Sequence, residues 1–168
     1  MNSLMESAGS AVNALKCELA SEVLRSSGSL RLRVTGWSML PSVMPGDTLI
    51  IERVNDRASP GDIVLFGRNR RLFVHRVISV AGSGGDMRLI TQGDGMRRPD
   101  PPGEASELLG KVSLIVRNGR GIEPRRRPGI AGRAVAALVR VSDSAARIVV
   151  GVHKMRQSSK EPVVTCQS

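Results

Sequence analysis

A serine, a histidine and two aspartates are the residues of this sequence that could together perform nucleophilic chemistry. Ser38 lies between Gly36 and Pro41, in a stretch that ends in a Pro-Gly-Asp turn. Glycine and proline together predict a rigid, exposed loop here rather than a helix. A serine hydroxyl is a weak nucleophile near neutral pH, so it needs a positioned base and a group that orients that base.

One of the two histidines of the chain can serve as that base. His75 lies in residues 71–80, which alternate like a β-strand and place Phe73, His75 and Val77 on one face. The turn-rich segment 91–101 offers two carboxylates, Asp94 and Asp100, that could orient the imidazole. Alone, His75 would fit a buried histidine bonded to a backbone group. The serine and aspartate motifs on either side favour the catalytic interpretation instead.

The order of these segments resembles the signal peptidase I family, in the branch with a Ser-His-Asp site found in archaea and the endoplasmic reticulum. That branch carries Ser-Met-x-Pro, Gly-Asp-x-Val-x-Phe, His-Arg-Val, a Gly-Asp loop that ends in aspartate, and Gly-Lys-Val. The similarity covers roughly half of the chain, and LexA-like self-cleaving peptidases are more distant relatives. The matching residues here are Ser38-Met39-Leu40-Pro41, Gly61-Asp62-Ile63-Val64-Leu65-Phe66, His75-Arg76-Val77, Gly93-Asp94 through Asp100, and Gly110-Lys111-Val112.

The resemblance implies a serine endopeptidase that cleaves a precursor or leader peptide after small residues. It implies Ser38 as nucleophile, His75 as general base and Asp100 as the carboxylate that orients the base. Supporting positions around the oxyanion site and its loops are Gly36, Met39 and Asp94. The expected partner is a peptide or protein precursor. No cofactor or metal is expected, because the triad needs none and the sequence has no ligand cluster.

Two departures from the family pattern and two alternative hypotheses accompany this interpretation. Gly95 and Met96 replace two asparagines of the family, and Gly36 replaces a hydroxyl that the bacterial form uses beside the oxyanion. Losing one such donor can cost roughly 10²–10³ in rate, which leaves backbone N–H groups to do this work. A second hypothesis is therefore a non-catalytic peptide-binding or scaffold domain that retains the fold. A third, self-cleavage at Ala8-Gly9, is weaker because three Ala-Gly pairs occur in the chain.

A Ser-Lys dyad is disfavoured by the positions of the lysines. The strand that would carry the dyad lysine contains none, because the lysines of the chain are Lys16, Lys111, Lys154 and Lys160. The histidine at position 75 is therefore the base that the sequence supports.

Short alternating runs predict that residues 29–120 form a catalytic β domain. Pro-Gly-Asp turns, Arg70-Arg71 and a Ser-Gly-Gly-Asp segment separate these runs. We expect a mainly β fold, a small partly open barrel of coiled antiparallel strands with an N-terminal and a C-terminal helix. The predicted strands are 30–34, 48–54, 62–66, 71–80, 87–91 and 108–116.

Residues 9–26 have the apolar spacing of a helix, which Gly28 ends. We expect the N-terminal segment 1–28 to pack on the body through one apolar face. Charged residues interrupt it and it lacks a basic start, so it does not resemble a signal peptide. The apolar face consists of Val12, Leu15, Leu19 and Val23.

The C-terminal part is the most basic of a chain whose formal net charge is +10. Residues 121–129 form a basic linker, residues 130–156 a predicted amphipathic helix with basic residues every seven positions, and residues 157–168 a flexible tail. This helix could dock on the domain, adsorb to an anionic membrane surface or bind nucleic acid. Nucleic acid is the least favoured partner, because stacking on bases needs aromatics and the chain has only three, Trp37, Phe66 and Phe73.

Composition sets the remaining expectations. No run approaches the roughly 20 apolar residues of a spanning helix, so we expect a cytoplasmic or peripherally membrane-associated protein. Cys17 and Cys166 lie near opposite ends of the chain, and unpaired thiols fit them better than a disulfide. The length of 168 residues suggests one domain with appendages.

Overall fold

The computed structural model describes residues 2–54, 58–82, 86–129 and 134–137, with the side chains of the N-terminal helix from Ala11 onward. Four residues, 134–137, form a helical turn in which Ala136 is buried. The rest of the predicted basic helix (130–156), the tail and Cys166 lie outside the described residues. Cys17 is a free cysteine.

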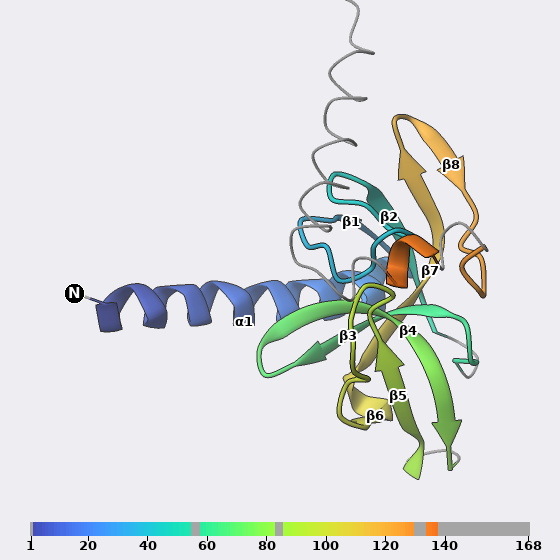
Figure 1. The fold of residues 1–168 in the computed structure, drawn as a ribbon. Helices are drawn as coiled ribbons and strands as arrows, with labels where there is room; N and C mark the ends of the chain where they lie inside the picture. Colours follow the sequence, from blue (N-terminus) through green and yellow to red (C-terminus); the bar gives the residue numbers. More distant parts are fainter. Residues whose placement is uncertain (1, 55–57, 83–85, 130–133, 138–168) are drawn as a thin grey trace, which may run out of the picture.

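Eight antiparallel strands form one open sheet, in the order β1-β2-β7-β3-β4-β5-β6, with β8 paired to β7 (Figure 1). This confirms the prediction of a mainly β fold, and the sheet is not closed. Two short strands, β6 and β8, were not predicted. The bounds are β1 Ser29–Arg33, β2 Thr48–Arg53, β3 Ile63–Arg68, β4 Arg71–Ala81, β5 Arg88–Gln92, β6 Gly103–Glu104, β7 Leu108–Arg117 and β8 Arg120–Ile122, with a 3-10 helix, η2, at Ala105–Glu107.

Two related turns begin the strands that flank the centre of the sheet. In each Pro-Gly-Asp sequence the glycine has a positive φ, 96° at Gly46 and 97° at Gly61, as a type II turn requires. The aspartate then closes the turn, since the backbone N–H of Met44 donates to Asp47 and that of Ser59 donates to Asp62. The turns therefore form from local sequence alone.

A two-residue turn at Asn69 and Arg70 joins β3 to β4. Both residues have positive φ, 51° and 60°, which matches the turn that suits the twist of a hairpin. The resulting register pairs Val64 with His75. Strand β4 then changes partner, because it pairs with β3 up to Arg76 and with β5 from Arg76 onward.

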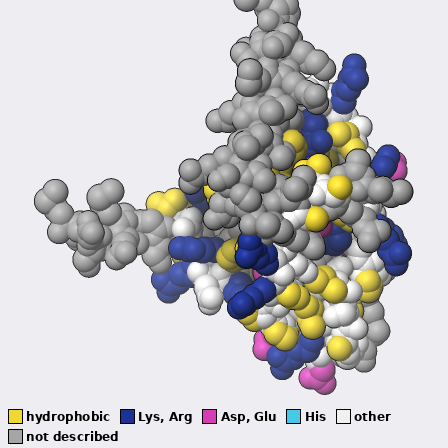
Figure 2. Space-filling model, in the orientation of Figure 1, with side chains coloured by type: hydrophobic (Ala, Val, Ile, Leu, Met, Phe, Trp, Pro, Cys, Tyr) yellow, Lys and Arg dark blue, Asp and Glu magenta, His cyan; other side chains and the backbone are white. Residues whose placement is uncertain are grey.

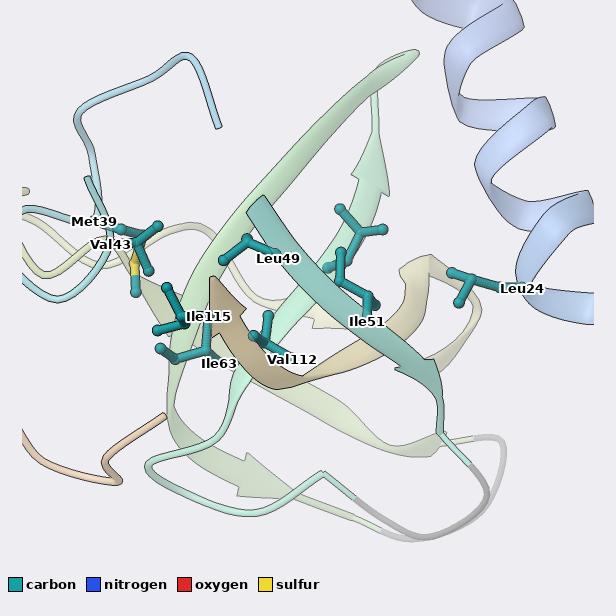
Figure 3. Packing of buried hydrophobic residues seen from close by; sticks show 9 residues of the cluster. Leu24, Met39, Val43, Leu49, Ile51, Ile63, Val112 and Ile115 are labelled. Carbon is teal, nitrogen blue, oxygen red and sulfur yellow. The ribbon is translucent and has the colours of Figure 1, made fainter. Parts of the chain in front are cut away.

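The buried side chains form two clusters, one on each side of the central strands. The larger cluster joins the C-terminal end of the helix, the loop after β1 and strands β2, β3 and β7 (Figure 3): Leu24, Met39, Val43, Leu49, Ile51, Ile63, Leu65, Val112 and Ile115. The smaller one consists of Ala58, Val64, Phe66, Val77, Met87 and Leu89.

The N-terminal helix, α1, is longer than predicted and packs through a different face. It runs over Asn2–Ser27, so it includes the Ala8-Gly9 bond, and it extends away from the sheet (Figure 1). Among its described side chains, the fully buried ones are Ala20 and Leu24, near its C-terminal end. Spacing alone could not find this face, because small alanines allow the close approach. Three residues of the predicted stripe are exposed: Val12, Leu15 and Leu19.

A buried ion pair ties the end of β7 to the loop after β1. Asp47 is 1 % exposed and accepts hydrogen bonds from Nε and Nη2 of Arg117, the latter at 2.7 Å. Nη2 of Arg117 also donates to the carbonyl of Ser42 at 3.1 Å. The carboxylate therefore holds both a turn and a strand against the loop that carries Ser38.

Replacement of Asp47 by asparagine should destabilise the domain by about 2–3 kcal/mol. Removing one partner of a fully buried ion pair lowers the free energy of unfolding by more than this. Here the loss is smaller, because Arg117 is a quarter exposed and water can partly solvate its charge. The measurement is chemical denaturation, with a lower midpoint and an unchanged dependence on denaturant. The matched control is Glu22→Gln, which breaks the exposed pair with Arg25. Equal midpoints for the two variants would contradict this assignment.

Candidate active site

The loop between β1 and β2 holds Ser38 by anchoring the residues that follow it. Met39, Leu40 and Val43 are buried, and two backbone hydrogen bonds fold the loop, from Leu40 to Trp37 and from Val43 to Met39. Met39 therefore supports the loop through its side chain in the core. Gly36 and Trp37 are exposed beside Ser38, which is half-buried.

His75 reaches the same place from the middle of β4. Its side chain is buried, and the rings of Phe66 and Phe73 lie against it with centroids 5.9 and 6.1 Å away. The alternation of β4 puts Phe73 and His75 on one face, as predicted. These two rings restrict the orientation of the imidazole and keep water from much of its surface.

Asp100 lies at the end of the loop that follows β5. Its backbone N–H donates to the carbonyl of Thr91 at 2.8 Å, and the Thr91 hydroxyl donates to Oδ2 at 2.6 Å. Burial by itself raises the pKa of this carboxyl. The hydrogen bonds from His75 and Thr91 outweigh burial, so the pKa of Asp100 lies below its ordinary value and the group is ionised at neutral pH.

These three side chains form one hydrogen-bonded line. His75 Nδ1 lies 2.7 Å from Oδ2 of Asp100, and Nε2 lies 3.0 Å from Oγ of Ser38. An ionised carboxylate can only accept, so Nδ1 carries the hydrogen and the lone pair of Nε2 faces the serine hydroxyl. This arrangement can take a proton from Ser38 and stabilise the resulting imidazolium.

Asp94 has a different partner from Asp100. Its two carboxylate oxygens accept from Nε and Nη2 of Arg76, each at 2.8 Å, and Oδ2 also accepts from the Ser42 hydroxyl. Arg76 donates further to the carbonyls of Gly61 and Arg125. The carboxylate at His75 is thus Asp100, and Asp94 holds the neighbouring segments together.

The loop after β5 packs directly on the backbone of Ser38. The N–H of Gly95 donates to the Ser38 carbonyl at 2.8 Å, and a side chain at Gly93 would come within 2.5 Å of that oxygen. The Gln92 amide donates to the Met96 carbonyl at 2.7 Å. Gly95 and Met96 have no amide side chains, and it is their backbone groups that make these hydrogen bonds.

Sequence reasoning missed several residues that position the site. Thr91 lies in the turn-rich segment 91–101, but nothing in its spacing predicts a bond to Asp100. Arg68 donates to Glu107 and, at 2.9 Å, to the carbonyl of Pro101, which fixes the chain just after Asp100. Such contacts join charged residues far apart in sequence, and they leave no periodic pattern.

A cleft of about 570 Å³ opens beside Ser38. Its walls come from α1, the end of β1 with the loop after it, and the first half of β4. Many of its lining side chains are apolar, and the space-filling view shows basic side chains where α1 meets the sheet (Figure 2). No described hydrogen bond uses the backbone N–H of Ser38.

Comparisons with known proteins add one finding. A family model described as Peptidase S24-like matches residues 6–113, more than half of the chain, and this range contains all three residues of the hydrogen-bonded line. The curated proteins give no match to this chain. Over the described residues, no helix has the length and apolar character to cross a membrane.

Stability should depend on the Asp100 carboxylate in acid. Because the folded state lowers the pKa of this group from its ordinary 3.8, the stabilisation is fully present above that value and is lost as pH falls through the folded pKa. The measurement is the free energy of unfolding of wild type and Asp100→Asn from about pH 6 down to about pH 2. The difference in unfolding free energy between the two proteins should shrink below about pH 4. A difference that stays constant over this range would contradict the lowered pKa of Asp100.

Proposed function

The chain belongs to the Peptidase S24-like family, and from this premise we propose that it is a serine endopeptidase of signal-peptidase type that uses Ser38, His75 and Asp100. The observation that carries the proposal is the pair of short contacts from His75, 2.7 Å to Asp100 and 3.0 Å to Ser38. The family supports a serine peptidase in general. Cleavage of a precursor or leader peptide after small residues is the finer part of the proposal.

Catalysis would proceed in two steps. Ser38 Oγ attacks the peptide carbonyl as its proton passes to Nε2 of His75, and the same proton then goes to the leaving amine as the C–N bond breaks. Water next attacks the acyl-enzyme carbonyl and gives a proton to His75, which returns it to Ser38 Oγ as the ester C–O bond breaks and the acid product leaves. Asp100 orients the imidazole and stabilises its charged form throughout.

The oxyanion would rely on backbone donors. Gly36 offers no hydroxyl near the developing charge, whereas the N–H of Ser38 is not used by any described hydrogen bond. A donor held by a rigid loop needs little reorganisation during the reaction. The buried anchors of the loop, Met39 and Val43, therefore contribute to catalysis by keeping that N–H in position.

An extended peptide is the substrate shape that suits the cleft. In the described sheet, β1 pairs only with β2, and the first half of β4 pairs only with β3, so each has one strand edge without a partner. Residues from both strands line the cleft. A peptide entering it could add backbone hydrogen bonds to such an edge, which is a common way to bind an extended chain.

We also propose a membrane surface as a setting for the reaction. The segment 130–156 has a basic face and an aliphatic face, the combination that adsorbs to anionic lipid. Leader peptides are presented at membranes, so adsorption would raise the local concentration of enzyme at its substrate. The alternative, a non-catalytic peptide-binding domain, is favoured by the absence of a hydroxyl at Gly36.

A peptide-library digest analysed by mass spectrometry tests the proposal. Wild type and Ser38→Ala are compared, each with and without vesicles that contain an anionic lipid. We expect cleavage after small residues in wild type and none in the variant, with faster cleavage on vesicles. Peptides that bind equally to both proteins and are never cut would favour the binding domain instead.

The role of His75 predicts a loss of turnover in its alanine variant. Because general-base catalysis contributes about 10²–10⁴ in rate, His75→Ala should reduce kcat by at least about 10². The assay uses a peptide found in the digest. Ile78→Ala, an exposed position on the same strand, is the control and should retain full activity. Near-wild-type turnover of His75→Ala would contradict the role of His75 as the general base.

A further inference from the structure

Among the described residues, every charged side chain that lines the cleft beside Ser38 is basic. Lys16 comes from α1, Arg33 from the end of β1 and Arg71 from the start of β4, and the described part of the lining contains no aspartate or glutamate. The three side chains are exposed. Three separate elements thus bring positive charge to one opening.

These cations also lack partners, in contrast to the buried arginines. Within the described residues no ion pair involves Lys16, Arg33 or Arg71. Arg76 and Arg117, by comparison, each bond to a buried aspartate. Solvated, unpaired cations at the rim of a cleft attract an anionic group on whatever enters it.

The walls of the cleft set the distance between the cations and the reacting bond. Arg71 precedes His75 by four residues on β4, and an extended strand rises about 3.3 Å per residue, so they are about 13 Å apart. Arg33 precedes Ser38 by five residues on the opposite wall. Both arginines line the same cleft as Ser38.

Most of the uncharged lining of the cleft is apolar. Leu32, Leu72 and Val74 also line the cleft. An acidic side chain there would lose water without gaining a partner, whereas small or apolar side chains would be accommodated. The cleft therefore distinguishes positions along a bound peptide by polarity.

We propose that the enzyme selects peptides with an acidic residue about four positions from the cleaved bond. An extended peptide of that length covers the same distance as β4 from His75 to Arg71, so its carboxylate would reach Arg71, and Arg33 adds positive charge to the same cleft. This inference rests on the proposed peptidase function, and it adds a substrate class: peptides that are small or apolar at the cut and acidic four residues away.

The size of the effect follows from exposed ion pairs. One exposed ion pair strengthens binding by at most about fivefold. Two such pairs, with Arg33 and Arg71, should therefore give about five- to tenfold selection of glutamate over glutamine in kcat/KM. The selection should fade at 1 M salt, where the Debye length falls to about 3 Å.

The test moves a single glutamate along one cleavable peptide. Matched peptides carry glutamate or glutamine at each position from six before to six after the cut, and kcat/KM is measured at low and high salt. We expect one maximum in the glutamate-to-glutamine ratio, about four residues from the cut. The double variant Arg33→Gln/Arg71→Gln should bring that ratio to within about twofold of one.

The control removes the same charge elsewhere. Arg88→Gln/Arg120→Gln changes two exposed arginines on β5 and β8, outside the cleft lining, and should leave the maximum unchanged. A flat profile, or equal loss in both double variants, would overturn the inference. Either result leaves cleavage of neutral peptides intact, so it is distinguishable from failure of the peptidase proposal.

Binding provides a measurement that does not need turnover. A fluorescein-labelled peptide and its glutamate-to-glutamine twin are titrated with Ser38→Ala, and anisotropy gives the two dissociation constants. Tighter binding of the acidic peptide, lost when Arg33 and Arg71 are replaced, would support the cation site even if no peptide is cut. Equal binding of both peptides would contradict it.

Discussion

The ion pair between Arg76 and Asp94 is the interaction on which the arrangement of the site depends. Both side chains are at most a tenth exposed, so each charge would be costly to bury alone. Their geometry is bidentate, and the remaining donors of Arg76 reach Gly61, Ser42 and Arg125. One guanidinium therefore joins a strand, three loops and the basic linker.

This pair lies directly beside the three residues of the proposed reaction. Arg76 follows His75 on β4, Asp94 begins the loop that ends at Asp100, and Ser42 belongs to the loop of Ser38. These three residues are separated by 37 and 25 positions in the chain, so local structure cannot align them. The buried Arg76–Asp94 pair and the hydrogen bond from the Gly95 N–H to the Ser38 carbonyl hold these distant segments next to one another.

Charge is used differently inside the protein and at its surface. Interior arginines meet carboxylates and fix backbone segments, whereas the cations at the cleft have no described partner and remain available to a substrate. The same residue type thus serves architecture in one place and selection in another. Burial decides between the two, because a buried cation must be paired and an exposed one need not be.

Much of the β domain could be predicted from sequence, because alternation and turn chemistry are local. The strand of His75 and the Pro-Gly-Asp turns follow directly from the order of residues. The packed face of α1 could not be predicted from apolar spacing. The small side chain of Ala20 lets the helix approach the sheet closely and is buried there, whereas the larger side chain of Leu15 is exposed. The bond from Thr91 to Asp100 and the basic cleft depend on contacts between distant segments, which no local pattern encodes.

The most direct test of the central claim is covalent labelling of Ser38 with a peptidyl fluorophosphonate. In this reaction the activated serine oxygen attacks phosphorus and fluoride leaves, so the label reports activation without a known substrate. Peptide mapping by mass spectrometry should find the adduct on Ser38, formed at least about 10² more slowly in His75→Ala. An adduct on a different serine, equal rates in the two proteins, or no adduct at all would contradict the account.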